Sequence, residues 1–255
     1  MNESIKNQLM SYDRHYFEYG GQRSTEFDLC ISANNTEASP EHDLTFVPVP
    51  GRDGELTEDN KRLSSFNKPI YVTIQSNENI EEVAHKINQW LKSEIRYKDL
   101  KKSWDPDYTY RAIVYEYFDI QDILPKFGRV PLPFRWHPVK YRNSGLVEAA
   151  VINGGILTNP ENRKSKPIIH IEGTGDIALQ LNGSDWCLLR SVDQEIIIDS
   201  EMETARRDNR AQNNKLLDVE QTDLFPLLVP GDNIISWTGN VQSIKITPRW
   251  EAIAT

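Results

Sequence analysis

The sequence predicts a mainly β protein with one helix, and its second half predicts a β-sandwich or jelly roll. Stretches in which apolar and polar residues alternate run through most of the chain. This period of two puts one set of side chains in a core and the other in water. Turn residues separate the stretches at the short spacing of all-β sandwiches. Only residues 80–91 repeat apolar residues at three and four, as a helix does.

The clearest strand of the second half covers residues 177–181, in which isoleucine or leucine alternates with polar or small residues. The Asn182-Gly183 pair after it readily adopts the positive φ angles of a tight hairpin turn. Upstream, a strand is expected from about Ile168, because the proline before it lacks an N–H. We interpret Gly173–Gly175 as a hairpin turn between the two strands, since it opens no helix that could cradle a phosphate.

The same pattern continues toward the end of the chain. Turn signals rich in glycine, asparagine and aspartate separate further apolar stretches. We expect strands at 195–199, 234–238 and 242–247, with turns at 230–233 and 239–240.

The first half is also rich in predicted strands. Residues 27–31 and 70–74 alternate, and residues 130–136 alternate around two prolines. Because proline lacks an N–H, this last strand is expected at a sheet edge or a bulge. Residues 108–118 carry apolar side chains on both faces, which predicts a strand that is covered twice or forms an interface.

Between these strands lie one helix and one long polar stretch. The helix expected at 80–91 has Asn77 or Asn79 available as its N-cap and glutamates near its first turn. Residues 50–61 begin with a Pro-Gly-Arg-Asp-Gly turn signal and remain polar. They are expected to form an exposed loop, and loops of this length usually have a function.

Length and composition indicate a globular protein. The 255 residues suffice for one large domain or two small ones. A change of composition across residues 143–155 predicts a boundary there, which gives an N-terminal domain at 1–145 and a C-terminal domain at 146–255. The formal net charge of −9 argues against a dedicated nucleic-acid binder, because such proteins place cations against phosphates.

The cysteines and the hydropathy bound the compartment. Cys30 and Cys187 lie far apart without metal-ligand spacing, as expected for a protein made in a reducing compartment. No apolar run approaches the roughly 18 residues that span a bilayer, and the polar opening lacks a signal-peptide stretch. Neither membrane insertion nor secretion through a signal peptide is expected.

No catalytic constellation is apparent in the sequence. The five histidines are scattered without metal-ligand spacing, and there is no Gly-x-Ser-x-Gly nucleophile elbow. Three acidic pairs lack the apolar surroundings that raise a carboxyl pKa for acid catalysis: Asp105 with Asp107, Asp119 with Asp122, and Glu201 with Glu203. We therefore expect a protein that is not an enzyme, with no cofactor and no metal.

Taken together, these residues resemble the distal tail protein family of long-tailed bacteriophages, known as Dit, over nearly the whole chain. In the first half the resemblance rests on Phe17, Gly20–Phe27, Pro50–Gly54 with Leu56, and Phe134–Pro138. Their order and spacing carry the resemblance, more than any single motif. In the second half it rests on Asn159, Pro160, Pro167, Gly175, Ile198, Asp199, Phe225, Pro226, Pro230, Gly231, Asn233, Ile235, Trp237, Gly239 and Pro248–Trp250.

The resemblance implies a structural hub with an N-terminal split-barrel domain, related to tail-tube folds, and a C-terminal galectin-like β-sandwich. In the family, six N-terminal domains close into a ring whose lumen continues the tail tube and lets DNA pass. The ring joins the major tail tube protein to the tail-associated hub protein. Receptor-binding or other baseplate proteins attach at the periphery in many members. Such a protein is made in the host cytoplasm and resides in the virion, at the distal tip of the tail.

Two places are candidates for the subunit contacts of such a ring. Arg52 and Asp53 lie in the predicted exposed loop, and Tyr115 and Tyr117 lie in the predicted two-sided strand. A closed ring needs two different surfaces on one subunit, which these places could supply. The acidic balance suits a channel for DNA, because acids repel phosphates. The second domain has no long insertion of the kind that carries receptor-binding proteins in some relatives.

Trp186 supports an alternative function for the C-terminal sandwich. A tryptophan face stacks on sugars, and Trp186 lies beside a turn where packing constrains it least. Trp237 shares a strand face with Ile235 and is expected in the core. The alternative is a carbohydrate-binding module that recognises host cell-wall saccharide through Trp186.

Overall fold

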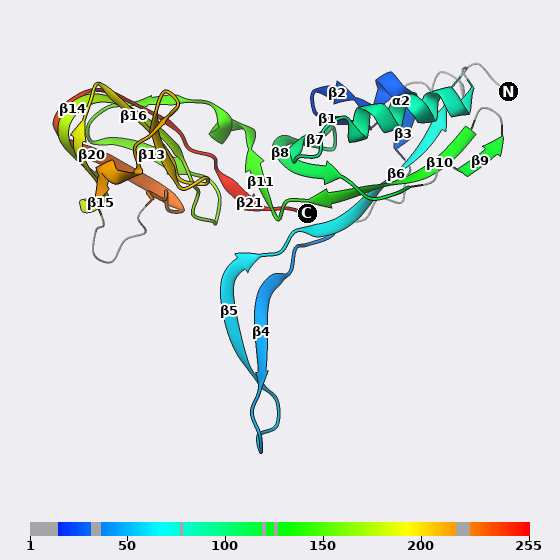
Figure 1. Cartoon of the computed structure of the whole chain (residues 1–255), viewed down its shortest axis with the longest axis horizontal. Coiled ribbons are helices and arrows are strands. Elements are labelled where there is room, and N and C mark those ends of the chain that lie inside the picture. The colour runs from blue at the N-terminus through cyan, green and yellow to red at the C-terminus, as the bar shows by residue number, and fades with distance from the viewer. Residues whose placement is uncertain (1–14, 32–36, 77–78, 119–120, 125–126, 218–224) are drawn as a thin grey trace. The chain divides into compact units, whose positions relative to one another are not determined.

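The computed structural model describes residues 15–31, 37–76, 79–118, 121–124, 127–217 and 225–255. The chain forms two compact units (Figure 1). The first unit is Met1–Lys140 with Ile253–Thr255, and the second is Tyr141–Ala252. The chain therefore passes between the units twice.

A ten-stranded antiparallel sheet forms most of the first unit. A single α-helix within the described residues, α2 (Ile80–Lys92), packs its apolar face into the core of this unit. The main path of the sheet runs β2 (Gln22–Arg23), β1 (Phe17–Tyr19), β7 (Lys98–Lys102), β8 (Asp105–Val114), β10 (Phe127–Trp136), β6 (Phe66–Gln75) and β3 (Leu29–Ile31). The short strands β9 (Gln121–Leu124), β11 (Val139–Arg142) and β21 (Glu251–Ile253) join it off this path, and the 3-10 turn η1 (Ser24–Phe27) precedes β3.

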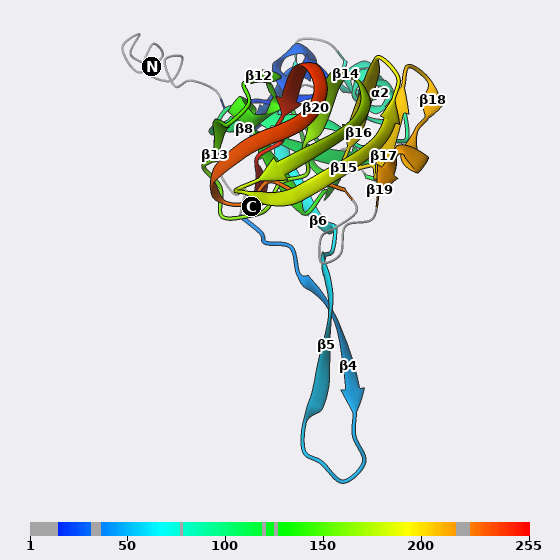
Figure 2. The same ribbon diagram turned by 90° about the vertical axis from the view of Figure 1, so that its left-hand side faces the viewer.

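A nine-stranded antiparallel sheet forms the second unit, and Figure 2 shows its strands. Together the two sheets confirm the predicted mainly β fold with one helix. The path runs β12 (Ala149–Val151), β20 (Gly231–Thr247), β14 (Ile168–Leu181), β16 (Glu195–Asp199), β17 (Thr204–Arg207) and β18 (Arg210–Ala211). Off the path lie β13 (Gly155–Asn159), β15 (Ser184–Val192) and β19 (Leu216–Leu217), with 3-10 turns η2 (Asn143–Leu146) and η3 (Asn213–Lys215).

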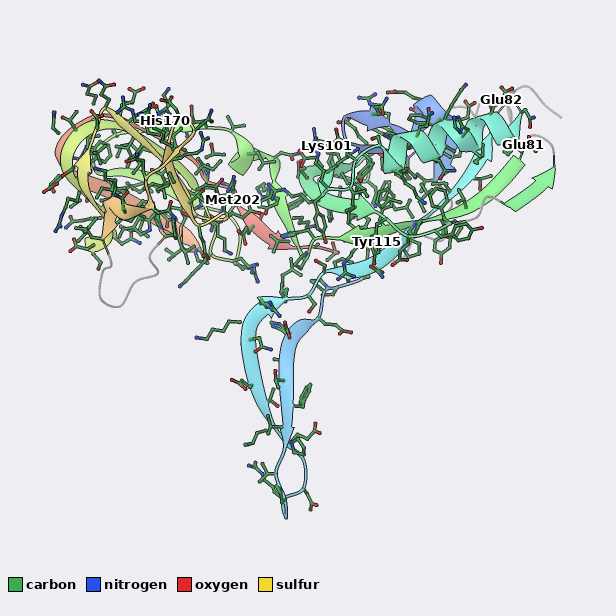
Figure 3. The ribbon with its side chains drawn as sticks, in the orientation of Figure 1. Glu81, Glu82, Lys101, Tyr115, His170 and Met202 are labelled. Carbon is green, nitrogen blue, oxygen red and sulfur yellow. The ribbon has the colours of Figure 1, made fainter. Side chains whose placement is uncertain are left out.

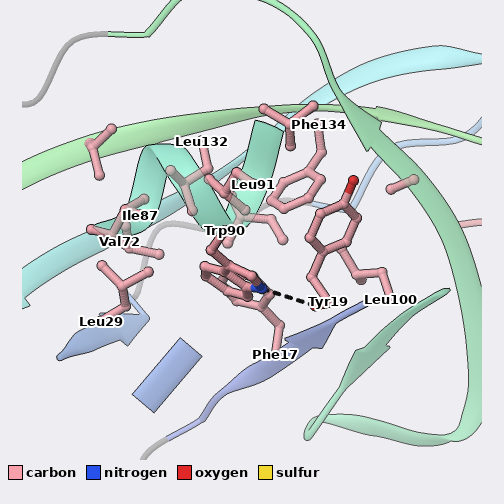
Figure 4. Packing of buried hydrophobic residues seen from close by; sticks show 14 of the residues in the cluster. Phe17, Tyr19, Leu29, Val72, Ile87, Trp90, Leu91, Leu100, Leu132 and Phe134 are labelled. Carbon is pink, nitrogen blue, oxygen red and sulfur yellow. Dashed lines mark hydrogen bonds between the residues drawn. The ribbon is translucent and has the colours of Figure 1, made fainter. Parts of the chain in front are cut away.

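Trp90 of α2 organises the core of the first unit (Figure 4). Its ring stacks on Phe27 with centroids 4.3 Å apart and lies 5.7 Å from the ring of Phe17. The indole N–H donates to the main-chain oxygen of Tyr19 at 3.0 Å, so burial leaves no unpaired donor. The helix begins as predicted, because the Asn79 side chain accepts from the amide of residue 81.

The polar stretch at 50–61, which was expected to be a loop, instead forms the tip and most of the second strand of a two-stranded ribbon. β4 (His42–Pro48) pairs with β5 (Glu55–Leu63) in a sheet of its own. Gly51 and Gly54 have positive φ angles and shape the tip. The prediction of exposure was correct and the prediction of irregular structure was wrong. Because both faces of the ribbon meet water, its sequence lacks the polar and apolar alternation that marks a half-buried strand.

Two strand predictions of the first unit need correction. β8 ends at Val114, so the expected strand at 108–118 stops four residues early. β10 lies inside the sheet between β8 and β6, although its prolines predicted a sheet edge or a bulge. The registers explain this: β9 covers β10 only as far as Arg129 and β8 begins at Phe134, so Pro131 and Pro133 have a partner on one side only.

Bulges in the second unit replace two predicted turns. β14 and β20 run without interruption through Gly173–Gly175 and Gly239-Asn240. The register between the two strands shifts between Thr174 and Ala178, so the glycines mark a bulge and not a chain reversal. The predicted hairpin turn at Asn182-Gly183 is confirmed, with positive φ at both residues between β14 and β15.

The segment that closes the second unit is held by packing and charge. Trp250 packs so closely on Gly145 that a Cβ added to Gly145 would lie 2.5 Å from the main-chain nitrogen of Trp250. Arg249 binds both carboxylate oxygens of Asp199, at 2.6 and 3.0 Å. Next to it Glu251 is only 4% exposed, and its nearest cation is Arg163 at 3.9 Å. Burial raises the pKa of Glu251 to about 7.

Gly239→Ala should destabilise the protein by about 3 kcal/mol. Gly239 has a φ of +104°, and the Cβ of an alanine there would lie 2.4 Å from the main-chain oxygen of Asp176. Gly231→Ala is the matched control, with positive φ but no atom within 4 Å, and should cost about 1 kcal/mol. Urea unfolding of the two variants measures the difference. Equal losses would show that the bulge is not tightly packed.

Glu251→Gln should stabilise the protein above pH 7 and flatten its stability profile. The folded state keeps the Glu251 proton between its ordinary pKa of 4.5 and about 7, whereas the unfolded chain releases it. Stability is therefore lost as pH rises through this window. At pH 8 the variant should gain up to about 3 kcal/mol in urea unfolding. The exposed Glu148→Gln serves as the control, and an unchanged slope in Glu251→Gln would contradict the assignment.

Candidate functional site

The β4–β5 ribbon exposes an unusual amount of apolar surface. Leu44, Phe46, Val47 and Leu56 are between 37% and 56% exposed. Val47 pairs directly with Leu56, so this pair shares one face, while Leu44 and Phe46 lie on the other. Figure 3 shows side chains standing out from both sides of the ribbon. Apolar surface on both faces of an exposed ribbon is typical of an interaction site.

Both edges of the ribbon are open. Within the described residues, neither β4 nor β5 has a ladder partner other than the other strand. Open edges present free N–H and C=O groups, and an isolated two-stranded ribbon is marginally stable in water. Cross-strand polar contacts support it, such as the amide of Asn60 with Asp43 and Thr45 at 3.1 Å each. The ribbon therefore has the properties of a segment that is completed by a partner.

Arg52 and Asp53, the first predicted contact pair, lie at the tip of the ribbon and are exposed. The amide of Arg52 donates to the Val49 oxygen at 3.2 Å, which closes the turn. The second pair, Tyr115 and Tyr117, follows the end of β8 and is 49% and 79% exposed. Figure 3 places Tyr115 beside the sheet, away from the ribbon tip. The two predicted pairs are thus on separate surfaces of the first unit.

Trp186 lies in the core of the second unit. It is 6% exposed, and its indole N–H donates to the main-chain oxygen of Leu227 at 2.9 Å. A buried ring offers no face on which a sugar could stack. The structure therefore supports core packing for this tryptophan and corrects the hypothesis that it contacts a saccharide.

One carboxylate from each of two acidic pairs takes part in structural contacts. Asp105 lies 3.0 Å from the Lys140 nitrogen and accepts a hydrogen bond from Tyr110. Burial opposes its ionisation, but these hydrogen bonds outweigh burial and lower the pKa of Asp105. Glu201 accepts from the Tyr141 hydroxyl at 3.0 Å and lies 3.3 Å from Arg249. The pair Asp119 and Asp122 falls outside the described side chains.

A buried lysine cluster, which the sequence did not predict, lies in the first unit. Lys102 is 3% exposed, and its nitrogen lies 4.1 Å from the centre of the Tyr110 ring. Burial lowers the pKa of Lys102 to about 8. Lys68 and Lys140 complete the set of cations, with Glu37 and Asp105 as their carboxylates. The members come from segments far apart in the chain, so no local pattern in the sequence could reveal them.

A hollow of about 580 Å³ lies beside the Gly20-Gly21 turn, between the end of α2 and β7. Four of its six charged residues form ion pairs, Arg96 with Glu94 at 2.6 Å and Lys101 with Glu18 at 3.8 Å, and the other two, Lys98 and Asp99, carry opposite charges. Balanced charge of this kind gives no preference for an anion or a cation. The charged lining residues are Glu18, Glu94, Arg96, Lys98, Asp99 and Lys101.

The comparisons with known proteins identify a shared fold. No family model and no curated protein matches the sequence. Among solved structures, the chain is similar to the Dit protein (gp 19.1) of phage SPP1, described as a paradigm of the hub adsorption apparatus in phages that infect Gram-positive bacteria. The sequences are 17% identical, the TM-score is 0.67, and the match covers 91% of this chain and 96% of that one. In the described part of this chain, no helix is long and apolar enough to span a membrane. The chain thus has the fold of a phage distal tail protein along nearly its whole length.

Proposed function

We propose that this chain is the structural hub of a phage tail tip, and that it acts by assembly and not by catalysis. The observation that carries the proposal is the shared fold with SPP1 Dit over 91% of the chain. A match of that extent includes both units, and not one widespread module alone. The proposal also gives a purpose to the exposed ribbon, which a monomer would leave uncovered.

In the proposed assembly, six copies close into a ring through the N-terminal domain, residues 1–145. The β4–β5 ribbon of each copy contacts the next copy, which covers its apolar faces and pairs its open edges. Such a contact joins two different surfaces and closes by rotation, as a ring requires. The segment with Tyr115 and Tyr117 offers a second exposed surface for contacts of this kind.

The proposed ring joins the major tail tube protein on one face to the tail-associated hub protein on the other, and DNA passes through its lumen. Residues 146–255 form a galectin-like platform at the periphery for baseplate or receptor-binding proteins, and so serve host adsorption. The protein would reside in the virion at the distal tip of the tail. The charged contacts of Asp105 and Glu201 support a role without catalysis, because both carboxylates already serve structural ion pairs.

The combined change Phe46→Ser, Val47→Ser and Leu56→Ser should shift the assembly toward the monomer. These side chains are about half exposed in the single chain, so their loss should cost little folding stability but should remove the apolar contact with a partner. Multi-angle light scattering should show six times the 29.4 kDa chain mass for the unchanged protein and a single chain mass for the variant. Thr57→Ser, on the same ribbon, is the control and should leave the mass unchanged. A hexamer in the triple variant would rule the ribbon out as the contact.

Arg52→Ala with Asp53→Ala tests whether the tip itself reaches a neighbour. Both side chains are exposed and occupy the turn, so their removal should leave the fold intact. If the tip makes charged contacts in the ring, sedimentation velocity should show a hexamer that dissociates at a protein concentration several-fold higher than for the unchanged chain. An identical dissociation profile would limit the contact to the strands of the ribbon.

A further inference from the structure

The two ends of the β4–β5 ribbon meet at one carboxylate. Glu37 lies shortly before β4, and Lys68 lies in β6, which follows β5 after a short connection. The Lys68 nitrogen is 3.0 Å from a Glu37 carboxylate oxygen. Lys102 of β7 lies 3.7 Å from the same oxygen. One side chain from the entering segment therefore bridges to the leaving strand and to the sheet.

The burial of this contact differs strongly between its two sides. The side chains of Lys68 and Lys102 are 9% and 3% exposed, whereas Glu37 is 59% exposed. Two buried ammonium groups thus share one carboxylate whose side chain is largely exposed to solvent. Burial opposes the ionisation of Glu37, but the Lys68 hydrogen bond and the lysine charges lower the pKa of Glu37 and keep it charged.

The remaining groups around the lysines are fixed by other contacts. Lys102 also donates to the main-chain oxygen of Thr255 at 3.1 Å. Lys140 is held by Asp105 at 3.0 Å and lies 4.2 Å from the centre of the Tyr108 ring. Glu37 is consequently the one carboxylate shown within 4 Å of Lys68 among the described residues, and it can be lost without dismantling the Lys140 pair.

We propose that Glu37 is an electrostatic latch that holds the base of the ribbon on the sheet through Lys68 and Lys102. With the latch closed, the ribbon is held in one orientation before it meets a partner. Preorganisation of this kind reduces the entropy lost on binding. When Glu37 is released, the base opens and the ribbon moves about its two connections. Because the two lysine nitrogens are buried, salt should screen this contact less than it screens a pair of two exposed side chains.

The latch can be tested by measuring distances between spin labels in the full-length chain. One label is attached at Glu55→Cys near the ribbon tip and the other at Glu82→Cys on the exposed side of α2, in a Cys30→Ser background. The labelled chain is diluted with unlabelled chain so that only distances within one copy are recorded. Glu37→Gln should broaden the distance distribution at least two-fold. Glu58→Gln, which removes a charge from the ribbon outside the cluster, should leave it narrow.

Glu37→Gln leaves Lys68 without its carboxylate, so a second variant guards against misfolding. Glu37→Gln with Lys68→Met removes both members of the pair and should broaden the distribution equally, with the near-ultraviolet circular dichroism of the aromatic core retained. Three results would overturn the latch: a narrow distribution in both variants, a broad one in the unchanged chain, or unfolding of both variants. The measurement concerns a single copy, so it stands whether or not the proposed ring forms.

Discussion

A two-stranded ribbon has no core of its own, and this constraint makes the β4–β5 ribbon depend on contacts beyond its own two strands. Each strand of β4–β5 has one ladder partner, and four large apolar side chains are distributed over its two faces. In a single chain this surface remains in water, which makes the ribbon marginal in isolation and prone to pairing. When a partner covers the ribbon, burial of its apolar side chains and pairing of its open edges stabilise the complex. The remainder of the first unit provides a firm base from which such a ribbon can operate.

That base depends on two different kinds of contact. The stack of Phe17, Trp90 and Phe27 fixes α2 against the sheet. The hydrogen bond from the Trp90 indole to the main-chain oxygen of Tyr19 links the helix to β1. The lysine cluster fixes the ribbon ends by charge, which is weaker in net terms than apolar packing but easier to release. The second unit also combines packing and charge: its tryptophans 186 and 250 are buried, and Arg249 binds Asp199 near the end of the unit.

The sequence predicted those features whose physical cause is local. The helix at Ile80–Lys92 followed from its apolar spacing and its asparagine cap, and the Asn182-Gly183 turn from the ease of positive φ. The turn predicted at Gly239 was wrong, because the sequence does not distinguish a glycine that allows a close approach of the backbone from a glycine that reverses the chain. The ribbon strands and the Glu37 contact could not be foreseen, since the first lack a buried face and the second joins residues 31 positions apart. The resemblance to distal tail proteins rested on order and spacing over the whole chain, and the shared fold agrees with it.

We propose that another copy of the chain completes this ribbon. Electron cryomicroscopy of the purified full-length protein tests it most directly. The images should show closed six-fold rings in which the residues of β4 and β5 lie against the N-terminal domain of the adjacent copy. Rings joined through residues 146–255, with every ribbon free in solvent, would contradict it.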